Sequence, residues 1–165
     1  MDKRNVFVAG AGYMGNGIAQ VAALAGYEVV MCDVSEGCLA SGMEAIESSL
    51  GKLLSREKIS GEQAERALAC IRTTCDLKEA AAADIVIEAV HENIELKKEV
   101  FARLDGICPP HTIIGTNTSA IPISSIAAAT SRPDRVVGIH FFGPVPLMRL
   151  VEVIKGLLTS EETMA

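Results

Sequence analysis

The chain has 165 residues, of which 49% are hydrophobic, so it can form one domain with a sizeable core. Its 21 acidic and 15 basic residues give a formal net charge of −6, which offers no general attraction to nucleic acid or to an anionic membrane. The apolar runs are too short to span a bilayer. Because a predicted strand begins directly after the first four residues, we expect no signal or transit peptide and a cytoplasmic protein.

Cysteine and histidine spacing argues against a disulfide framework and a metal centre. The five cysteines are odd in number and form no Cys-x-x-Cys pair, so we expect reduced thiols. The histidines His91, His111 and His140 lack the spacing of metal ligands, so we expect no metal.

Short apolar runs alternate with helical patterns along the chain. They occupy residues 6–8, 29–31, 85–87, 113–114 and 136–137. Strands that alternate with helices predict a parallel sheet buried on both faces, so we expect an α/β, Rossmann-type doubly wound fold. The last run, residues 150–154, alternates at the polar Glu152, which predicts an edge or antiparallel strand.

Two stretches between and after the strands have helical character. Residues 35–69 are rich in Ala, Glu and Leu and are interrupted at Ser60-Gly61, which predicts a helix hairpin projecting from the sheet, with Ser60 capping its second helix. Residues 94–107 predict another amphipathic helix. Residues 159–162 resemble a helix start, so we expect residues 1–158 to form the domain and 159–165 to begin a helix leading to an absent helical domain.

A glycine motif follows the first predicted strand. Gly10, Gly12 and Gly15, with Met14 among them, match the pattern in which a tight turn opens a helix whose N-terminus binds a pyrophosphate. Alone, the motif is compatible with a glycine-rich turn that binds nothing. Asp33 ends the second predicted strand, where a carboxylate can accept hydrogen bonds from the adenosine ribose and repel a 2′-phosphate. The glycine motif and Asp33 together predict that the chain binds NAD rather than NADP.

A histidine and a carboxylate are candidates for proton transfer near the C-terminus. His140 ends one predicted strand and Glu152 lies in the next, and a turn through two prolines can fold the carboxylate beside the imidazole as a general base requires. The alternatives are a core histidine and an exposed edge acid. Ser119 follows the strand predicted near 112–115, where open sheets bind ligands, and it could also be a helix cap ahead of Ile121-Pro122.

Four segments resemble the 3-hydroxyacyl-CoA dehydrogenase family, particularly its short-chain 3-hydroxybutyryl-CoA members. They are Glu88-Ala89-Val90-His91-Glu92-Asn93, Asn117-Thr118-Ser119, His140-Phe141-Phe142-Gly143-Pro144 and Leu150-Val151-Glu152-Val153-Ile154. The resemblance implies NAD-dependent oxidation of an (S)-3-hydroxyacyl-CoA to the 3-ketoacyl-CoA, or the reverse, as in β-oxidation and butyrate metabolism.

The resemblance also implies roles for individual residues. His140 matches the catalytic base, Glu152 its carboxylate partner, and Ser119 a residue that contacts the substrate oxygen. Positions along the nicotinamide and ribose end of the cofactor are matched by Glu92, Lys97 and Asn117, and coenzyme A contacts by Ser49 and Arg56. On composition alone, Lys97 and Lys98 form a solvated helix face and Arg56 is a surface charge.

Two departures from the family pattern limit what the resemblance implies. Gly143 stands where the family often has Asn, which leaves only a turn at that position. The resemblance also implies a second, helical domain that completes the acyl pocket and forms a homodimer, and we expect these 165 residues not to include it. We therefore expect NAD binding and little turnover from this chain. The alternatives are another NAD-dependent 3-hydroxy acid or sugar-nucleotide dehydrogenase, and a non-catalytic, crystallin-like NAD-binding protein.

Overall fold

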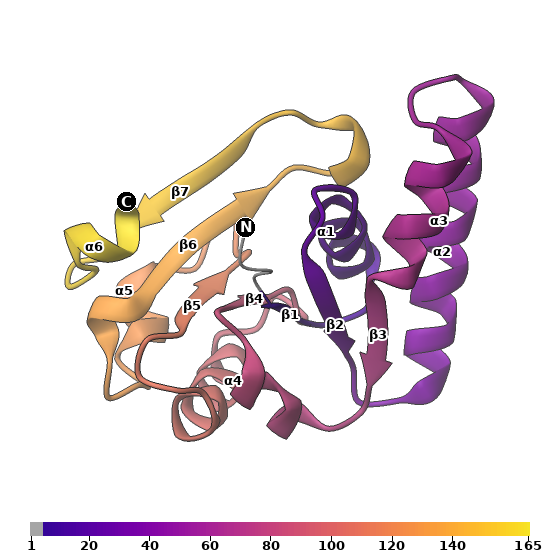
Figure 1. The fold of residues 1–165 in the computed structure, drawn as a ribbon. Coiled ribbons are helices and arrows are strands. Elements are labelled where there is room, and N and C mark those ends of the chain that lie inside the picture. The colour runs from indigo at the N-terminus through magenta and orange to yellow at the C-terminus, as the bar shows by residue number, and fades with distance from the viewer. Residues whose placement is uncertain (1–4) are drawn as a thin grey trace.

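The computed structural model describes residues 5–165 and contains one seven-stranded sheet in the order β3-β2-β1-β4-β5-β6-β7 (Figure 1). The expectation about a leader rests on the first four residues, which lie outside the described part. The strands are β1 (Asn5–Ala9), β2 (Glu28–Cys32), β3 (Ile71–Thr74), β4 (Ile85–Glu88), β5 (Ile113–Thr116), β6 (Val136–Phe141) and β7 (Val151–Lys155). The α-helices are α1 (Tyr13–Leu24), α2 (Glu36–Ser55), α3 (Gly61–Ala69), α4 (Ile94–Ile107), α5 (Ile123–Ala127) and α6 (Glu161–Met164), and the 3-10 helices are η1 (Leu77–Ala82), η2 (Pro133–Arg135) and η3 (Val145–Leu147).

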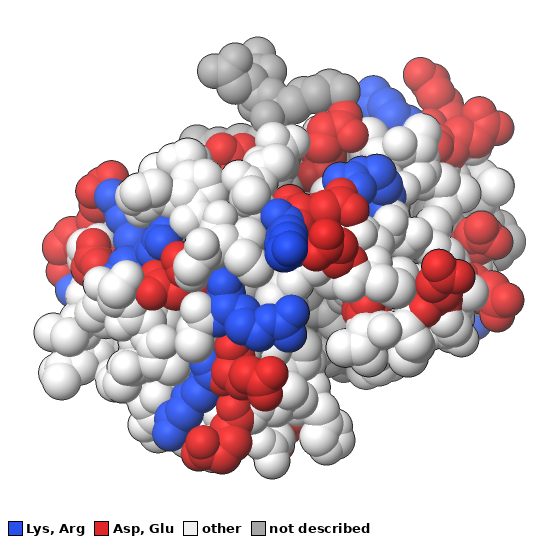
Figure 2. Space-filling model, turned by 90° about the horizontal axis from the view of Figure 1, so that it is seen from below, with Lys and Arg blue, Asp and Glu red and all other residues white. Residues whose placement is uncertain are grey.

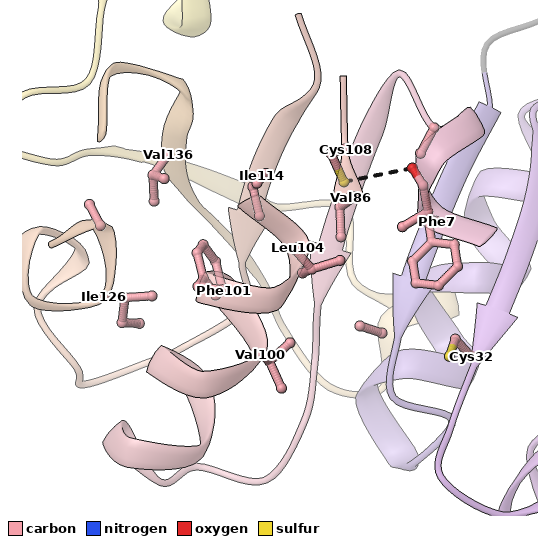
Figure 3. Close-up of a cluster of buried hydrophobic side chains, with 14 of the residues drawn as sticks. Phe7, Cys32, Val86, Val100, Phe101, Leu104, Cys108, Ile114, Ile126 and Val136 are labelled. Carbon is pink, nitrogen blue, oxygen red and sulfur yellow. Dashed lines mark hydrogen bonds between the residues drawn. The ribbon is translucent and has the colours of Figure 1, made fainter. Parts of the chain in front are cut away.

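Helices cover both faces of the sheet, so the predicted doubly wound fold is confirmed. Alternate residues of β1 point to opposite layers: Val6 and Val8 pack with α1, α2 and α3, whereas Phe7 packs with α4 and α5. Figure 3 shows the second layer, in which Phe101 and Leu104 of α4 lie against the sheet. All strand pairs are parallel except β6 with β7, which confirms the predicted antiparallel last strand.

A buried thiol is part of the layer drawn in Figure 3. The Cys108 thiol donates to the carbonyl oxygen of Ala80 over 3.6 Å. Burial raises the pKa of Cys108 to about 11, so the thiol stays protonated and packs as a small apolar group.

The predicted helix hairpin is present as α2 and α3, which pack against α1 while their joined ends extend beyond the sheet (Figure 1). Ile46 and Leu50 of α2 and Ala67 of α3 are buried in the layer shared with α1. Ser60 caps α3 as predicted: its hydroxyl accepts from the backbone N–H of Gln63, whose side chain accepts from the backbone N–H of Ser60.

Strand β3 was not anticipated. It forms the edge beside β2, and its residues Ile71 to Thr74 are only half-buried or exposed. Arg72 and Thr73 interrupt the apolar pattern by which the other strands are recognised, because an edge strand needs no continuous hydrophobic run.

The helix start expected after residue 159 is confirmed. Ser160 caps α6 by accepting a hydrogen bond from the backbone N–H of Thr163 at 3.1 Å. The Thr159 side chain is buried and donates to the carbonyl oxygen of Val136 over 2.6 Å, which fixes the turn before the helix to β6.

The surface carries both signs of charge. On the face shown in Figure 2, basic and acidic side chains are interspersed, and neither forms a large patch of its own. Among residues 5–165, no helix has both the length and the apolar character needed to cross a bilayer.

A carboxylate on α4 predicts acid sensitivity of the fold. Asp105 accepts from the backbone N–H of Ser131 and from Arg132 Nε, both at 2.7 Å. Burial acts to raise the pKa of Asp105, but these hydrogen bonds and the Arg132 charge outweigh it and lower that pKa. A depressed pKa means that the unfolded chain binds more protons, so this stabilisation is present above the ordinary carboxyl pKa and is lost as the pH falls through the folded value.

We expect Asp105→Asn to lower the free energy of unfolding by about 2 kcal/mol at neutral pH. Urea unfolding should show this difference shrinking at a pH below the ordinary carboxyl pKa, as the wild-type carboxylate is also protonated. Asp134→Asn is the matched control, since Asp134 is 55% exposed and lies 4.0 Å from its nearest cation. An unchanged difference at both pH values would contradict the prediction.

Candidate active site

The glycine turn between β1 and α1 is imposed by close packing at two of its three positions. Gly10 has φ +114°, and a Cβ there would lie 2.6 Å from the carbonyl oxygen of Ala89. A Cβ on Gly15 would lie 1.8 Å from the carbonyl oxygen of Gly10, so only glycine lets the helix approach the turn. Gly12, the N-cap of α1, has nothing within 4 Å of its Cβ direction, which leaves open space at the helix N-terminus.

The predicted acid is hydrogen-bonded to this turn. Asp33 follows β2, and its carboxylate accepts from the backbone N–H of Ala11 at 2.8 Å and of Val34 at 2.7 Å. It faces a hollow of about 630 Å³, called the first hollow, whose lining includes Gly10, Gly12, Met14, Asp33 and Val90. The turn and the acid are therefore parts of one site.

A second hollow of about 380 Å³ adjoins the first. The two share Met14, Ala89 and Val90 in their linings, so together they make one groove from Asp33 to the end of β6. The second hollow gathers most of the remaining candidates, namely Glu92, Lys97, Asn117, Ser119 and His140.

His140 and Glu152 meet across the antiparallel pair of β6 and β7, where they occupy the same register position. His140 Nδ1 lies 2.8 Å from Glu152 Oε2. A carboxylate can only accept, so Nδ1 carries the proton and Nε2 keeps a free lone pair. The His140 side chain is 17% exposed and its ring centroid lies 4.5 Å from that of Phe142. The imidazole thus has a fixed tautomer and one nitrogen available to the second hollow.

Ser119 does not cap the helix that follows it. The N-cap of α5 is Pro122, and no side chain caps this helix. The neighbouring Thr118 hydroxyl accepts from the backbone N–H of Ile121 at 3.0 Å, in the turn before α5. The expectation that Ser119 serves as a cap is wrong. Ser119 is exposed, and within the described residues its hydroxyl has no hydrogen-bond partner, which leaves it free for a ligand.

Asn117 links the ends of β5 and β6. Its Oδ1 accepts from the backbone N–H of Phe141 at 2.8 Å, and its own backbone N–H donates to the carbonyl oxygen of Glu88 at 2.8 Å. The N–H groups of the Asn117 side-chain amide remain available as donors to the second hollow, which Asn117 lines. Asn117 therefore holds the backbone next to His140 while presenting a polar group beside it.

A buried ion pair lies beneath the second hollow. Lys97 is 1% exposed, and its Nζ lies 2.6 Å from Glu88 Oε1 and 3.3 Å from Glu92 Oε2. Glu88, which is fully buried, also accepts from the Thr116 hydroxyl at 2.7 Å. The interpretation of Lys97 as part of a solvated face is wrong. Glu88 was not anticipated, although a carboxylate that closes an apolar strand is a signal for a buried partner.

Glu92 connects this ion pair to the serine loop. Its Oε1 accepts from the Thr118 hydroxyl and, at 3.2 Å, from the backbone N–H of Ser119. Burial acts to raise the pKa of Glu92, but the Thr118 hydrogen bond, the Lys97 charge and the Ser119 N–H outweigh it and lower that pKa. Glu92 is therefore an anion that fixes the backbone of Ser119.

A third hollow of about 340 Å³ lies between α1, α2 and the loop after β6. Ser49 and Arg56 both line it, together with Lys52, which was not anticipated. Gln20 also lines it, and among the described buried side-chain atoms its Nε2 alone has no hydrogen-bond partner. Two cations and a buried unpaired donor favour an anionic or carbonyl-bearing ligand here.

No three His, Cys, Asp or Glu side chains between residues 5 and 165 gather closely enough to hold a metal ion. The cysteines in this range are all free.

Comparison with known proteins identifies the family. The model of the 3-hydroxyacyl-CoA dehydrogenase NAD binding domain matches residues 5–165. The chain belongs to this family. It is 49% identical over 163 residues to a probable 3-hydroxybutyryl-CoA dehydrogenase of Bacillus subtilis, a match covering 99% of this chain and 57% of the relative. It is 45% identical to mitochondrial hydroxyacyl-coenzyme A dehydrogenase of the mouse, covering 97% of this chain and 53% of the relative.

Solved structures show the same NAD-binding architecture. The crystal structure of an (S)-3-hydroxybutyryl-CoA dehydrogenase from Ralstonia eutropha superposes with a TM-score of 0.95 at 46% identity, covering 98% of this chain and 57% of that one. The chain thus spans little more than half the length of these dehydrogenases.

Proposed function

We propose that the chain is the cofactor-binding and catalytic-base part of an NAD-dependent 3-hydroxyacyl-CoA dehydrogenase, which interconverts an (S)-3-hydroxyacyl-CoA and the 3-ketoacyl-CoA. One observation carries the proposal: His140, whose Nδ1 is paired with Glu152, lines the same hollow in which the groove from Asp33 ends. A proton acceptor at that end of a dinucleotide groove is what alcohol oxidation requires.

The residues of the groove fit NAD. The open space at Gly12 lets the backbone amides at the N-terminus of α1 reach a pyrophosphate, since no Cβ intervenes. Asp33 would hold the adenosine ribose, exchanging its hydrogen bond with Ala11 for ribose hydroxyls. Lining the nicotinamide end would be Met14, Glu92, Lys97 and Asn117.

The mechanism divides the reaction between a hydride and a proton. NAD, when bound, supplies the hydride acceptor. His140 Nε2 takes the proton of the C3 hydroxyl, and Glu152 stabilises the imidazolium that forms. The Ser119 hydroxyl donates to the substrate oxygen and keeps it aligned with His140, while Glu92 holds the Ser119 backbone in place.

The coenzyme A part of the substrate is assigned to the third hollow. Lys52 and Arg56 would neutralise its phosphates, and Ser49 would contribute a hydroxyl. A helical domain following residue 165 would complete the acyl pocket and form a homodimer, and the protein would act in the cytoplasm without nucleic acid or membrane partners.

Fusion to the C-terminal part of the Bacillus subtilis relative tests this proposal. The 165-residue chain should bind NADH in calorimetry but reduce acetoacetyl-CoA slowly, because one wall of the acyl site is missing. The fusion should turn over acetoacetyl-CoA with NADH at least about a hundredfold faster, a gain that substrate positioning can supply. Absence of turnover in the fusion, with NADH binding intact, would refute the proposed reaction, and the 3-hydroxy acids and sugar nucleotides of related dehydrogenases would then be assayed.

Removing the acid tests the cofactor assignment. Asp33→Ala should weaken NADH binding about tenfold to a hundredfold, since two hydrogen bonds to a charged group are lost. The variant should also lose the preference for NADH over NADPH, because the carboxylate no longer repels a 2′-phosphate. Calorimetry with both cofactors measures this, and Asp134→Ala, outside all three hollows, is the control. Equal NADH affinity in the two variants would contradict the assignment.

A further inference from the structure

Tyr13 stands exposed between the hollows. It is the first residue of α1, directly after Gly12, and 67% of it is accessible. Its side chain lines both the first and the third hollow. A large aromatic side chain left in solvent at the boundary of two hollows is placed to contact what fills them.

The ring of Tyr13 lies on the backbone of Gly143. A Cβ at Gly143 would be 2.7 Å from Tyr13 Cε1 and 3.0 Å from the Tyr13 hydroxyl oxygen, so the ring occupies the space that a side chain at position 143 would fill. Within residues 5–165, no hydrogen bond satisfies the Tyr13 hydroxyl. The absence of a side chain at Gly143 thus leaves the space that the Tyr13 ring occupies, and the Tyr13 hydroxyl is available to a ligand.

Tyr13 and Gly143 lie where the second and third hollows meet. Gly143 lines the second hollow and the next residue, Pro144, lines the third. A ligand whose phosphates lie at Lys52 and Arg56 and whose reacting carbon lies at His140 must extend past this junction. In an acyl-CoA, the part between phosphates and thioester is the pantetheine arm.

We propose that Tyr13 is a further substrate-positioning residue: its ring, seated on Gly143, supports the pantetheine arm between the third and second hollows, and its hydroxyl hydrogen-bonds an amide of that arm. This inference rests on the proposed function. A phenol matches the arm chemically, because the arm alternates apolar methylene groups with amides and the phenol has an apolar face and a polar tip.

A double-mutant cycle in the fusion with the Bacillus subtilis relative tests the inference, with calorimetric titration of acetoacetyl-CoA and, separately, of NADH. Tyr13→Phe should weaken acetoacetyl-CoA binding about fivefold, the effect of one hydrogen bond. Tyr13→Leu should weaken it more. Gly143→Ala should also weaken it, because the new methyl group displaces the ring, but should add nothing in the Tyr13→Leu background. NADH affinity should fall by a smaller factor than acetoacetyl-CoA affinity, since the backbone amide of Tyr13 at the N-terminus of α1 remains.

The same exchanges at Tyr27, the other tyrosine, are the control, because Tyr27 precedes β2 and lines none of the three hollows. Unchanged acetoacetyl-CoA affinity in both Tyr13 variants would overturn the inference. So would additive effects of Gly143→Ala and Tyr13→Leu, or an equal loss of NADH affinity. Failure of the fusion without these exchanges to bind acetoacetyl-CoA while it binds NADH would instead refute the substrate assigned under the proposed function.

Discussion

Turnover of acetoacetyl-CoA with NADH should fall about a thousandfold when His140 is replaced by Gln in the fusion with the Bacillus subtilis relative, as for the loss of a general acid–base group. Gln fills a similar space, but it cannot take up or release the proton that the proposed mechanism assigns to His140 Nε2. NADH affinity should change by less than about twofold, because the loss lies in the chemical step rather than in cofactor binding.

His111→Gln is the matched control for this exchange. His111 is 67% exposed, and its Nε2 lies 4.0 Å from Asp84, outside the three hollows. Steady-state rates and NADH titrations on both variants separate catalysis from binding. If His140→Gln kept the turnover of His111→Gln, the general-base role of His140 would be refuted.

Replacing Glu88 by Ala should lower the free energy of unfolding by about 3 kcal/mol. The change leaves the ammonium of Lys97, which is 1% exposed, with only the more distant carboxylate of Glu92 as a counter-charge. Exchanging both residues, Glu88→Leu with Lys97→Met, should recover most of the stability, because the buried charges are removed together.

Urea unfolding measures these effects, and NADH titration separates them from function. Glu95→Ala is the control. Glu95 lies on α4, as Lys97 does, its side chain is 78% exposed, and it pairs with Lys98 at 3.4 Å. Its loss should therefore lower the free energy of unfolding by less than about 0.5 kcal/mol. The double variant should be stable but should bind NADH weakly, since Lys97 lines the second hollow. Stability of Glu88→Ala equal to that of Glu95→Ala would show that the pair carries no such energy.

Elements with a strong local pattern could be predicted from the sequence. The helix predicted at residues 94–107 coincides with α4, because its apolar period and its Asn93 cap are local features. The capping box of Ser60 and Gln63 is local in the same sense. Strand β3 could not be predicted from the sequence, because it is a strand through its pairing with β2 and not through a hydrophobic run.

Side-chain contacts between distant elements were harder to predict. The Glu88–Lys97 pair joins β4 to α4, and nothing in either segment shows that both side chains turn inward. The Thr118 hydroxyl, and not that of Ser119, bonds the turn before α5, and this depends on the conformation of the folded loop. The seating of Tyr13 on Gly143 brings together residues 130 positions apart, so no local pattern reveals it.

The carboxylate partner of His140, Glu152, lies on the edge strand β7. All residues of β7 are exposed, and it is paired on one side only, with β6. Side chains alternate between the two faces of a strand, so a slip of β7 by one residue would carry Glu152 to the opposite face and leave His140 without a carboxylate. Under the proposed mechanism, turnover therefore depends on the alignment of this one strand. A protein that binds NAD normally and has lost turnover is the expected signature of a misaligned β7.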